Sequence, residues 1–366
     1  MPCSDGAREE VARTERTAAQ CPDVLVVGLG PAGARAAAVA ATAGCRVVGI
    51  ERRSRIGEPV QCAELVSGAF TVEGMRWDVV SSQSVSRMVT VVEGEPPESA
   101  DGFPGRMISR RLFDQQLAEH AVARGARLML GVALTQLCDD GRVCLSNGMT
   151  LRPHALVGAD GPRSRVGAAI GRANRELVVA RQITVPLEAP YDATDIFLRA
   201  EYHGGYGWLF PKGGEANLGV GVDARSRERL KPLLEGLRAE LASAGRIGAA
   251  AAVGLTGGLI PVGGRVAASG CLGAVPVALA GDAAGLTNPV TGAGIEAAVR
   301  SGELAGRAVA GWLGGRRAAL QDYEEELSEL YDGAYARAQR HRREVLRCAS
   351  ASSLRRGWIS SPEYWA

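Results

Sequence analysis

The stretch DVLVVGLGPAG, residues 23–33, decides the fold of this 366-residue chain. Its first five residues are apolar apart from the leading aspartate, which is typical of a strand that is buried on both faces. An alanine-rich helix follows as far as Ala43, Gly44 ends it, and residues 46–51 (RVVGIE) predict a second strand. Strand, helix and strand within ~30 residues make one complete βαβ unit.

Three glycines in this unit have separate tasks. Gly28 permits the tight turn, Gly30 has no Cβ to keep the backbone away from a pyrophosphate, and Gly33 lets helix and strand pack closely. The phosphates would then lie at the positive end of the helix. Glu51 ends the second strand, where its carboxylate can accept hydrogen bonds from ribose hydroxyls. The unit therefore predicts a bound dinucleotide.

A second signal has to decide between NAD and FAD, because the glycine motif fits both. Residues 279–285 (LAGDAAG) and 288–294 (NPVTGAG) predict a buried strand that delivers Asp282 at its carboxyl end, and then a helix that starts at the ligand. Asp282 suits a ribityl hydroxyl, and the helix start between Gly292 and Ile295 suits the negative charge of a reduced flavin. The motif favours FAD, with a helix cap as the alternative role of Asp282.

Composition limits the class of protein. The chain is 46% hydrophobic and 22% charged with a net charge of +2 and no Lys/Arg block, which argues against a nucleic-acid partner. No apolar run reaches the ~18 residues of a membrane span, and residues 1–20 predict a disordered leader without the apolar core of a secretory signal. The eight cysteines form no CxxC pair and the four histidines show no ligand spacing, so we expect reduced thiols, a cytoplasmic protein and no metal.

The two nucleotide motifs together resemble the FAD fold of p-hydroxybenzoate hydroxylase-like flavoproteins. Asp160 and Gly161, in VGADGPRSRV (residues 157–166), resemble the third motif of that superfamily, near the flavin pyrophosphate. Arg110, in RRLFD (residues 110–114), matches an arginine that packs toward the cofactor in these proteins. A surface cap of the following helix is the alternative role of Arg110.

Two further segments narrow the family. Residues 206–213 (YGWLFPKG) match the YxWxFPKG signature of geranylgeranyl reductases, and residues 57–64 (GEPVQCAE) are similar to their GxPVxCGE stretch, with Ala63 where the family has glycine. The resemblance is to enzymes, the digeranylgeranylglycerophospholipid reductases among them, that saturate isoprenoid double bonds with reduced FAD. It implies that Cys62 borders both the flavin and the substrate cavity, where a thiol can position the alkene or relay a proton. A small buried cysteine is the alternative.

Three aromatic residues alternate in the YxWxFPKG segment. Tyr206, Trp208 and Phe210 would face one side of a strand, where they can line an apolar pocket for a polyprenyl chain. Ordinary core packing is the competing interpretation. Lys212 fits either a charge near the flavin or a solvated turn residue.

We therefore expect an α/β protein with a Rossmann-like FAD-binding fold of the p-hydroxybenzoate hydroxylase type and an interleaved β-rich substrate domain. The predicted FAD-binding domain comprises residues 21–80, 106–175 and 270–315. The predicted substrate domain comprises residues 81–105 and 176–269, and residues 316–366 form a helical tail. The predicted catalytic residues are Cys62, Tyr206, Trp208 and Phe210. The predicted cofactor-binding residues are Gly28, Gly30, Ala32, Gly33, Glu51, Arg52, Cys62, Ala63, Arg110, Asp160, Gly161, Gly281, Asp282, Gly292, Gly294 and Ile295.

The favoured function is an FAD-dependent reduction of carbon–carbon double bonds in a polyprenyl chain, on a lipid or a quinone tail, by hydride transfer from reduced flavin. Alternatives are an aromatic-ring monooxygenase, an electron-transfer flavoprotein that reduces quinone, and a non-catalytic FAD-binding module. Because the chain has one dinucleotide motif, either NAD(P)H or ferredoxin would supply electrons. A polyprenyl substrate also implies peripheral contact with the inner face of a membrane.

Overall fold

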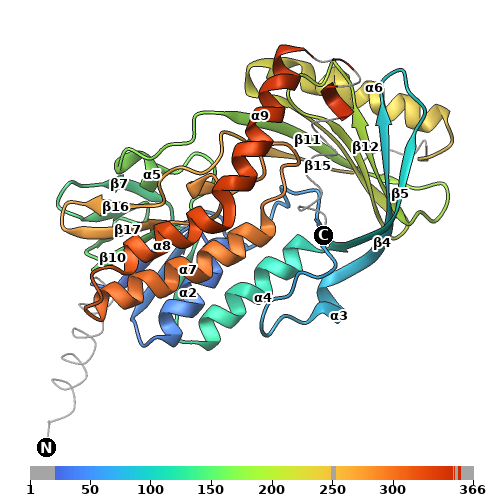
Figure 1. Ribbon diagram of the computed structural model, residues 1–366. Coiled ribbons are helices and arrows are strands. Elements are labelled where there is room, and N and C mark those ends of the chain that lie inside the picture. The colour runs from blue at the N-terminus through green and yellow to red at the C-terminus, as the bar shows by residue number, and fades with distance from the viewer. Residues whose placement is uncertain (1–20, 249–252, 349, 351–352, 356–366) are drawn as a thin grey trace, which may run out of the picture.

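The computed structural model describes residues 21–248, 253–348, 350 and 353–355 (Figure 1). The predicted leader, residues 1–20, lies outside the described residues. Two large sheets stand at opposite ends of the molecule, the first covered by the helices α2, α4, α7 and α8 (Figure 1). The α/β class predicted from the sequence is confirmed.

The first sheet has six strands and carries the glycine motif. Its strands, in spatial order, are β16 (Ser269–Leu272), β17 (Val275–Leu279), β10 (Ala155–Gly158), β1 (Val24–Val27), β2 (Val47–Glu51) and β6 (Arg127–Leu130). All neighbours pair in parallel except β16 and β17. The strands β1 and β10 are buried along their whole length, which explains their unbroken apolar sequences.

Two glycine-containing helices cross closely over this sheet. Helix α2 (Pro31–Thr42) continues the glycine motif, and α7 (Ile295–Leu313) packs against it. A Cβ on Gly302 of α7 would lie 2.1 Å from the carbonyl oxygen of Ala32, so only glycine permits this approach. Helix α4 (Arg110–Ala123) lies on the other side of α2. The two ends of the chain therefore build one nucleotide-binding layer.

The second sheet has eight strands and supplies the β-rich part. Their spatial order is β15 (Val253–Pro261), β11 (Leu177–Pro186), β14 (Glu215–Asp223), β13 (Gly207–Lys212), β12 (Ala193–Leu198), β4 (Ser81–Val92), β5 (Glu98–Ile108) and β3 (Leu65–Ser67). Helix α6 (Leu230–Ser243) packs its leucine face against this sheet. Strand β3 belongs to this second sheet, although it lies within residues 21–80, which were predicted to belong to the FAD-binding domain. The chain therefore also crosses from the first sheet to the second between β2 and β3.

Strand β5 departs from what its own residues suggest, because the glycines and Pro104 of residues 98–108 are typical of a turn. A 3-10 turn (Ala224–Arg229) precedes α6, and α7 starts at Ile295, within the range that the sequence indicates. A small antiparallel meander consists of β7 (Leu134–Leu137), β8 (Val143–Leu145) and β9 (Thr150–Leu151).

The described part of the C-terminal segment is largely helical and contacts both parts of the molecule. Helix α8 (Ala319–Leu327) passes through a π-turn (Ser328–Asp332) into α9 (Gly333–Arg347). Gln339 donates to the carbonyl of Gly263, and Arg342 donates to the carbonyl of Gly204 in the β-rich part. No helix in the described ranges is long and apolar enough to cross a membrane.

Candidate functional site

The glycine turn between β1 and α2 is shaped for a phosphate group. Gly28 has φ of +91° and a Cβ there would lie 2.3 Å from the carbonyl oxygen of Ala159, while a Cβ on Gly33 would lie 1.8 Å from the carbonyl oxygen of Gly28. Gly30 differs, because a Cβ on it would meet no atom within 4 Å. Gly28 and Gly33 thus hold the turn together, and Gly30 leaves open space at the N-terminus of α2, where backbone N–H groups favour an anion.

Glu51 lies at the end of β2, directly beside this turn. Its carboxylate accepts hydrogen bonds from the backbone N–H of Leu29 (3.1 Å) and of Arg53 (3.0 Å). The remaining lone pairs of the carboxylate are available to ribose hydroxyls. Arg52 is exposed and does not line the cavity, whereas Arg53 does and also donates to Gln61 at 2.5 Å.

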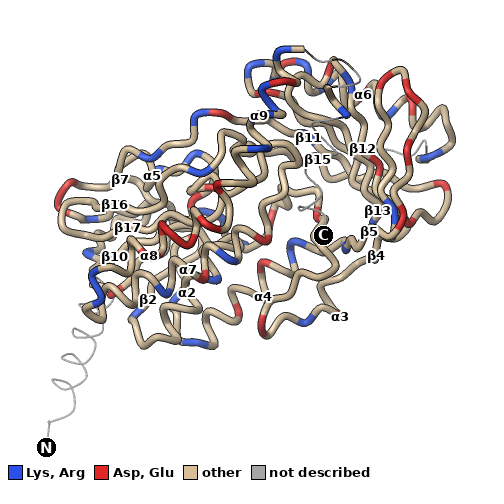
Figure 2. The backbone as a smooth tube through the Cα atoms, viewed as in Figure 1, with Lys and Arg blue, Asp and Glu red and all other residues tan. Residues whose placement is uncertain are grey.

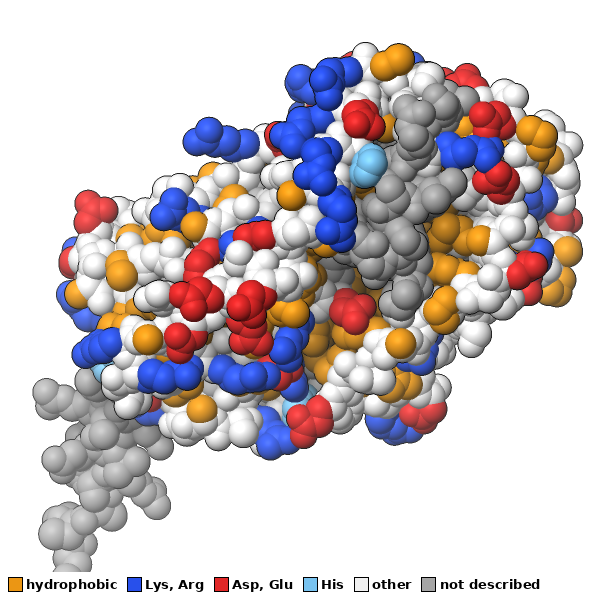
Figure 3. All heavy atoms as spheres, in the orientation of Figure 1, with side chains coloured by type: hydrophobic (Ala, Val, Ile, Leu, Met, Phe, Trp, Pro, Cys, Tyr) orange, Lys and Arg blue, Asp and Glu red, His pale blue; other side chains and the backbone are white. Residues whose placement is uncertain are grey.

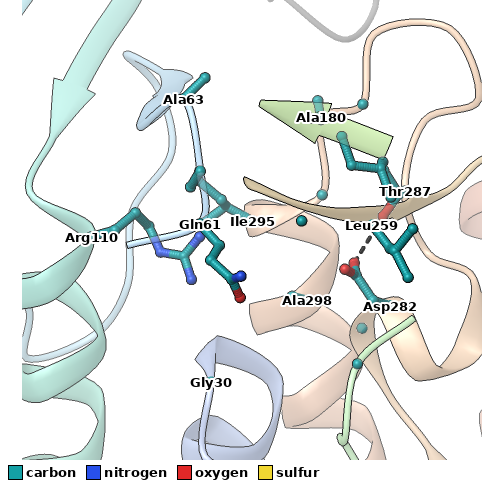
Figure 4. A pocket seen from close by; sticks show the side chains of 18 of the residues that line it. Gly30, Gln61, Ala63, Arg110, Ala180, Leu259, Asp282, Thr287, Ile295 and Ala298 are labelled. Carbon is teal, nitrogen blue, oxygen red and sulfur yellow. Dashed lines mark hydrogen bonds between the residues drawn. The ribbon is translucent and has the colours of Figure 1, made fainter. Parts of the chain in front are cut away.

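Asp282 approaches the same space from the far end of the chain. It lies in the short 3-10 helix η2 (Gly281–Ala284) after β17, and its Oδ1 accepts a hydrogen bond from the Thr287 hydroxyl at 2.9 Å. Burial raises the pKa of Asp282, and the positive charge of Arg110 opposes that rise. Figure 4 shows Asp282 and Arg110 on opposite sides of the cavity, with Gly30 below them. Asp282 caps no helix with its side chain, so that alternative is excluded.

Arg110 and Cys62 lie close together on one wall. The Arg110 guanidinium is bound by both carboxylate oxygens of Asp114, each at 2.9 Å, and it points into the cavity rather than onto the surface (Figure 4). Burial raises the pKa of the Cys62 thiol, and the nearby Arg110 charge acts against this rise. A thiol in this position is protonated near neutral pH.

The two residues of the third predicted motif, Asp160 and Gly161, have different roles. Asp160 accepts hydrogen bonds from the hydroxyl of Ser164, the N-cap of helix α5 (Arg165–Ala169), and from the N–H groups of Arg165 and Val166, so its carboxylate is bound at the start of that helix. Gly161 follows with φ of +86°, a Cβ on it would meet no atom within 4 Å, and it lines the cavity. Only the glycine of this pair therefore faces the cofactor space.

Trp208 and Phe210 lie on one face of β13, and Tyr206 directly precedes this strand. Tyr206 and Trp208 make an edge-to-face contact with ring centroids 5.8 Å apart, and Trp208 and Phe210 lie 6.5 Å apart. All three line the cavity and also belong to, or pack against, a buried apolar cluster. The two interpretations, pocket wall and core packing, thus both hold for the same side chains.

A cavity of about 390 Å³ joins these segments between the two sheets. Of the predicted site residues it is lined by Gly30, Ala32, Glu51, Cys62, Ala63, Arg110, Gly161, Tyr206, Trp208, Phe210, Gly281, Asp282, Gly292, Gly294 and Ile295. Gly28, Gly33, Arg52 and Asp160 do not line it. In the described part of the chain, no group of three or more Cys, His, Asp or Glu side chains is arranged to hold a metal ion.

The sequence does not indicate the hydrogen bonds and ion pairs that several polar residues form around the cavity. Gln182 receives a hydrogen bond from the Trp208 indole (3.0 Å) and donates to the carbonyl of Cys62 (3.0 Å), so it ties the aromatic row to the cysteine loop. The buried Glu64 forms an ion pair with Lys212, which is partly exposed and does not line the cavity, so Lys212 is not a charge on the cofactor. The contacts of Gln182 with Cys62 and of Glu64 with Lys212 each join residues more than a hundred positions apart in the sequence.

The cavity fits FAD on its own geometry. Gly30 leaves room for a pyrophosphate at a helix N-terminus, Glu51 stands where a ribose would lie, and Asp282 and the start of α7 face the opposite end of the space. The fold and the site together define a flavoprotein of the p-hydroxybenzoate hydroxylase type that binds FAD.

Comparison with known proteins narrows this class. Residues 104–338 match the family model of the FAD binding domain. The chain is 34% identical over 311 residues to digeranylgeranylglycerophospholipid reductase 2 of Methanopyrus kandleri, which covers 79% of this chain and 76% of that protein. It is 34% identical over 335 residues to the digeranylgeranylglycerophospholipid reductase of Methanocella arvoryzae, with 84% and 83% covered.

A solved structure agrees with the sequence relatives. The geranylgeranyl bacteriochlorophyll reductase-like protein of Thermoplasma acidophilum superimposes with a TM-score of 0.78 at 25% identity, over 92% of this chain and 90% of that one. The chain belongs to the geranylgeranyl reductase family of FAD-dependent oxidoreductases. The family and the cofactor predicted from the sequence motifs are both confirmed.

Proposed function

We propose that this protein reduces carbon–carbon double bonds of a polyprenyl chain, on a lipid or a quinone tail, with FAD as the hydride carrier. The observation that carries the proposal is the cavity of about 390 Å³, in which the nucleotide-binding motifs form one wall and the row Tyr206, Trp208 and Phe210 forms another. An unactivated alkene offers no polar handle, so a dry apolar wall is what orients it.

When bound, reduced FAD supplies the hydride. The chain's own residues would then orient the alkene and supply the proton. Cys62 stands in the wall with its thiol protonated, because burial raises its pKa, and a protonated thiol can give up its proton to the second carbon of the double bond.

The Cys62 loop is held in place from the β-rich sheet. Trp208 donates to Gln182, Gln182 donates to the carbonyl of Cys62, and the Tyr206 hydroxyl donates to the carbonyl of Thr291 in the segment before α7. These bonds fix the aromatic wall to both the cysteine loop and the loop before α7. Misplacement of reacting groups by ~1 Å can cost on the order of 10²-fold in rate, so this bracing matters for the reaction.

Contact with a membrane surface is part of the proposal. Helix α9 carries five arginines and one glutamate, and Figure 3 shows basic side chains in a row over it. The preceding segment, α8 and the π-turn, is acidic instead, so the charge of the tail is segregated (Figure 2). Anionic lipid attracts such a basic surface by ~1 kcal/mol per residue near the membrane.

Sedimentation with vesicles tests this contact. We expect more binding to vesicles that contain phosphatidylglycerol than to neutral ones, and loss of that excess in Arg340→Glu/Arg343→Glu. The matched control reverses two exposed arginines elsewhere, Arg127 and Arg172. If the α9 variant and the control variant bind anionic vesicles equally, α9 is not the part that contacts the membrane.

The electron donor, NAD(P)H or ferredoxin, is identified by which of them reduces the bound flavin.

The alkene chemistry is tested by anaerobic stopped-flow spectroscopy. Dithionite-reduced wild type should be reoxidised by a geranylgeranyl lipid, and Cys62→Ser should be reoxidised more slowly with its FAD content unchanged. Equal rates in the two proteins would move proton transfer away from Cys62. Failure of the wild type with several polyprenyl lipids would remove the reductase function and leave electron transfer to quinone as the better account.

A further inference from the structure

Glu64 has an unusual place in the cavity wall. It lies two residues after Cys62, and with φ of +69° it is the only non-glycine residue in the described ranges with a positive φ. Its side chain is only 2% exposed, and its backbone N–H donates to the Cys62 sulfur at 3.2 Å. A bulky residue adopts this backbone conformation at a cost, so its surroundings must hold it there.

The Glu64 carboxylate is fixed by donors from three separate segments. Oε1 accepts the backbone N–H of Arg110 at 2.8 Å, and Oε2 accepts the Asn217 amide at 3.1 Å. Oε2 also accepts a hydrogen bond from Nζ of Lys212, the last residue of β13. The ion pair thus joins the end of the YxWxFPKG segment to the end of the loop that carries Cys62.

Lysine is a rare choice in this chain. Of its 42 Lys and Arg residues only Lys212 and Lys231 are lysines, and among the described residues arginine forms nearly all the other ion pairs. Arginine stays charged at any physiological pH, whereas a lysine ammonium can give up a proton and regain it.

Lys212 also reaches water, which Glu64 does not. The Lys212 side chain is 29% exposed, while its partner is almost fully buried in the cavity wall. The pair therefore forms a hydrogen-bonded link from solvent to the buried Glu64, whose backbone N–H contacts the Cys62 sulfur. Burial raises the pKa of the Cys62 thiol, and the negative charge of Glu64 adds to that rise, so a thiolate formed there has a strong tendency to recover a proton.

We propose that Lys212 and Glu64 form a proton relay that protonates the Cys62 thiolate again after each reduction. The relay rests on the proposed function. For each double bond, one carbon takes the hydride of reduced FAD and the other takes the Cys62 proton, so that an S–H bond breaks and a C–H bond forms. The Lys212 ammonium then passes a proton to the Glu64 carboxylate, Glu64 passes that proton on to the thiolate, and the neutral amine takes a proton from water.

Arginine at position 212 is the variant that separates a relay from a structural pair. Lys212→Arg keeps the positive charge beside Glu64 but cannot pass a proton. Its first reduction should run at the wild-type rate, because Cys62 starts out protonated, and the later reductions should slow by about tenfold or more. Glu64→Gln should behave in the same way, and Lys231→Arg, at a side chain that is 70% exposed, is the matched control.

The experiment follows a polyprenyl lipid with several double bonds by mass spectrometry, without oxygen and with excess dithionite. A wild-type rate in Lys212→Arg through all reductions would overturn the relay and leave the reductase function standing. A wild type that reduces no polyprenyl lipid would overturn the function, and the relay would fall with it. Flavin content and melting temperature of each variant exclude damage to the fold.

A second readout needs no turnover. Selective ¹⁵N-lysine labelling gives one side-chain signal for each of the two lysines, and Lys231→Arg assigns them. The Lys212 signal should move in Glu64→Gln while that of Lys231 stays in place. If the chemical shift of the Lys212 signal is unchanged by this substitution, the ion pair does not exist in solution. That result would refute the relay without any measurement of the reaction.

Discussion

Gly30 and Gly33 lie three residues apart in one turn, yet substitution should affect different properties of the protein. A Cβ on Gly33 would lie 1.8 Å from the carbonyl oxygen of Gly28, and no side-chain rotation can relieve a clash with backbone. A Cβ on Gly30 would meet nothing within 4 Å, and its backbone is extended with φ of −70°. Gly33→Ala should therefore damage the fold, and Gly30→Val should damage only cofactor binding.

The size of each effect follows from these contacts. Overpacking costs typically 1–3 kcal/mol, and the 1.8 Å approach puts Gly33→Ala at about 3 kcal/mol. An unfolding entropy of about 2.1 cal/mol/K per residue converts this into a melting temperature about 4 °C lower for a chain of this length. Gly30→Val should leave the stability of the apoprotein within about 0.5 kcal/mol but weaken FAD binding about tenfold or more, since the side chain occupies the place of the pyrophosphate.

Thermal unfolding of the apoproteins and calorimetric titration with FAD measure the two effects separately. Gly236→Ala is the matched control: this glycine lies in α6, nothing lies within 4 Å of its Cβ position, and alanine there should raise stability by about 0.5–1 kcal/mol. Full FAD affinity in Gly30→Val would refute the placement of the phosphates. An unchanged melting temperature in Gly33→Ala would refute the packing argument.

Three further predictions concern the walls of the cavity. Glu51→Ala should weaken FAD binding by about 1–2 kcal/mol in calorimetry, because the ribose loses its acceptor; unchanged affinity would argue against that role. Trp208→Ala should lower the free energy of unfolding by about 3–5 kcal/mol in denaturant titration and spare the FAD content, since the indole is buried in an apolar cluster that contacts no phosphate motif; loss of flavin would contradict this separation. Cys62 should react with iodoacetamide more slowly than the exposed Cys271 near pH 8, because burial raises the pKa of the Cys62 thiol. Its reaction rate should continue to increase with pH above the usual thiol pKa of ~8.5. Peptide mass spectrometry measures both rates, and a faster reaction of Cys62 than of Cys271 would contradict a protonated thiol in the cavity wall.

The nucleotide-binding half was predictable because its signals are local. The turn at residues 28–33 and the buried strand before Asp282 each indicate their geometry within a dozen residues. Glycine positions in such turns are dictated by backbone contacts, as the approach of Gly33 to Gly28 demonstrates. The convergence of both motifs on one cavity then follows from the parallel strands β1, β10 and β17, which end at the same edge of the sheet.

The polar bracing of the cavity was not predictable from sequence, because each contact depends on tertiary placement. Glu64 and Lys212 are 148 positions apart, and each is an ordinary charged residue in its own segment. Strand β5 is hard to recognise for a related reason: its glycines and Pro104 are typical of turns, and its pairing with β4 makes the segment a strand. Arg52 was predicted in place of Arg53 because adjacency in sequence says nothing about which side chain turns inward.

The central claim is that reduced FAD in this protein saturates an alkene. The most direct measurement incubates the dithionite-reduced protein with a geranylgeranyl lipid in the absence of oxygen and follows the lipid by mass spectrometry. The account predicts a gain of about 2 Da for each double bond, in step with flavin reoxidation. A lipid of unchanged mass, or a product that forms only with oxygen and has gained an oxygen atom, would contradict it.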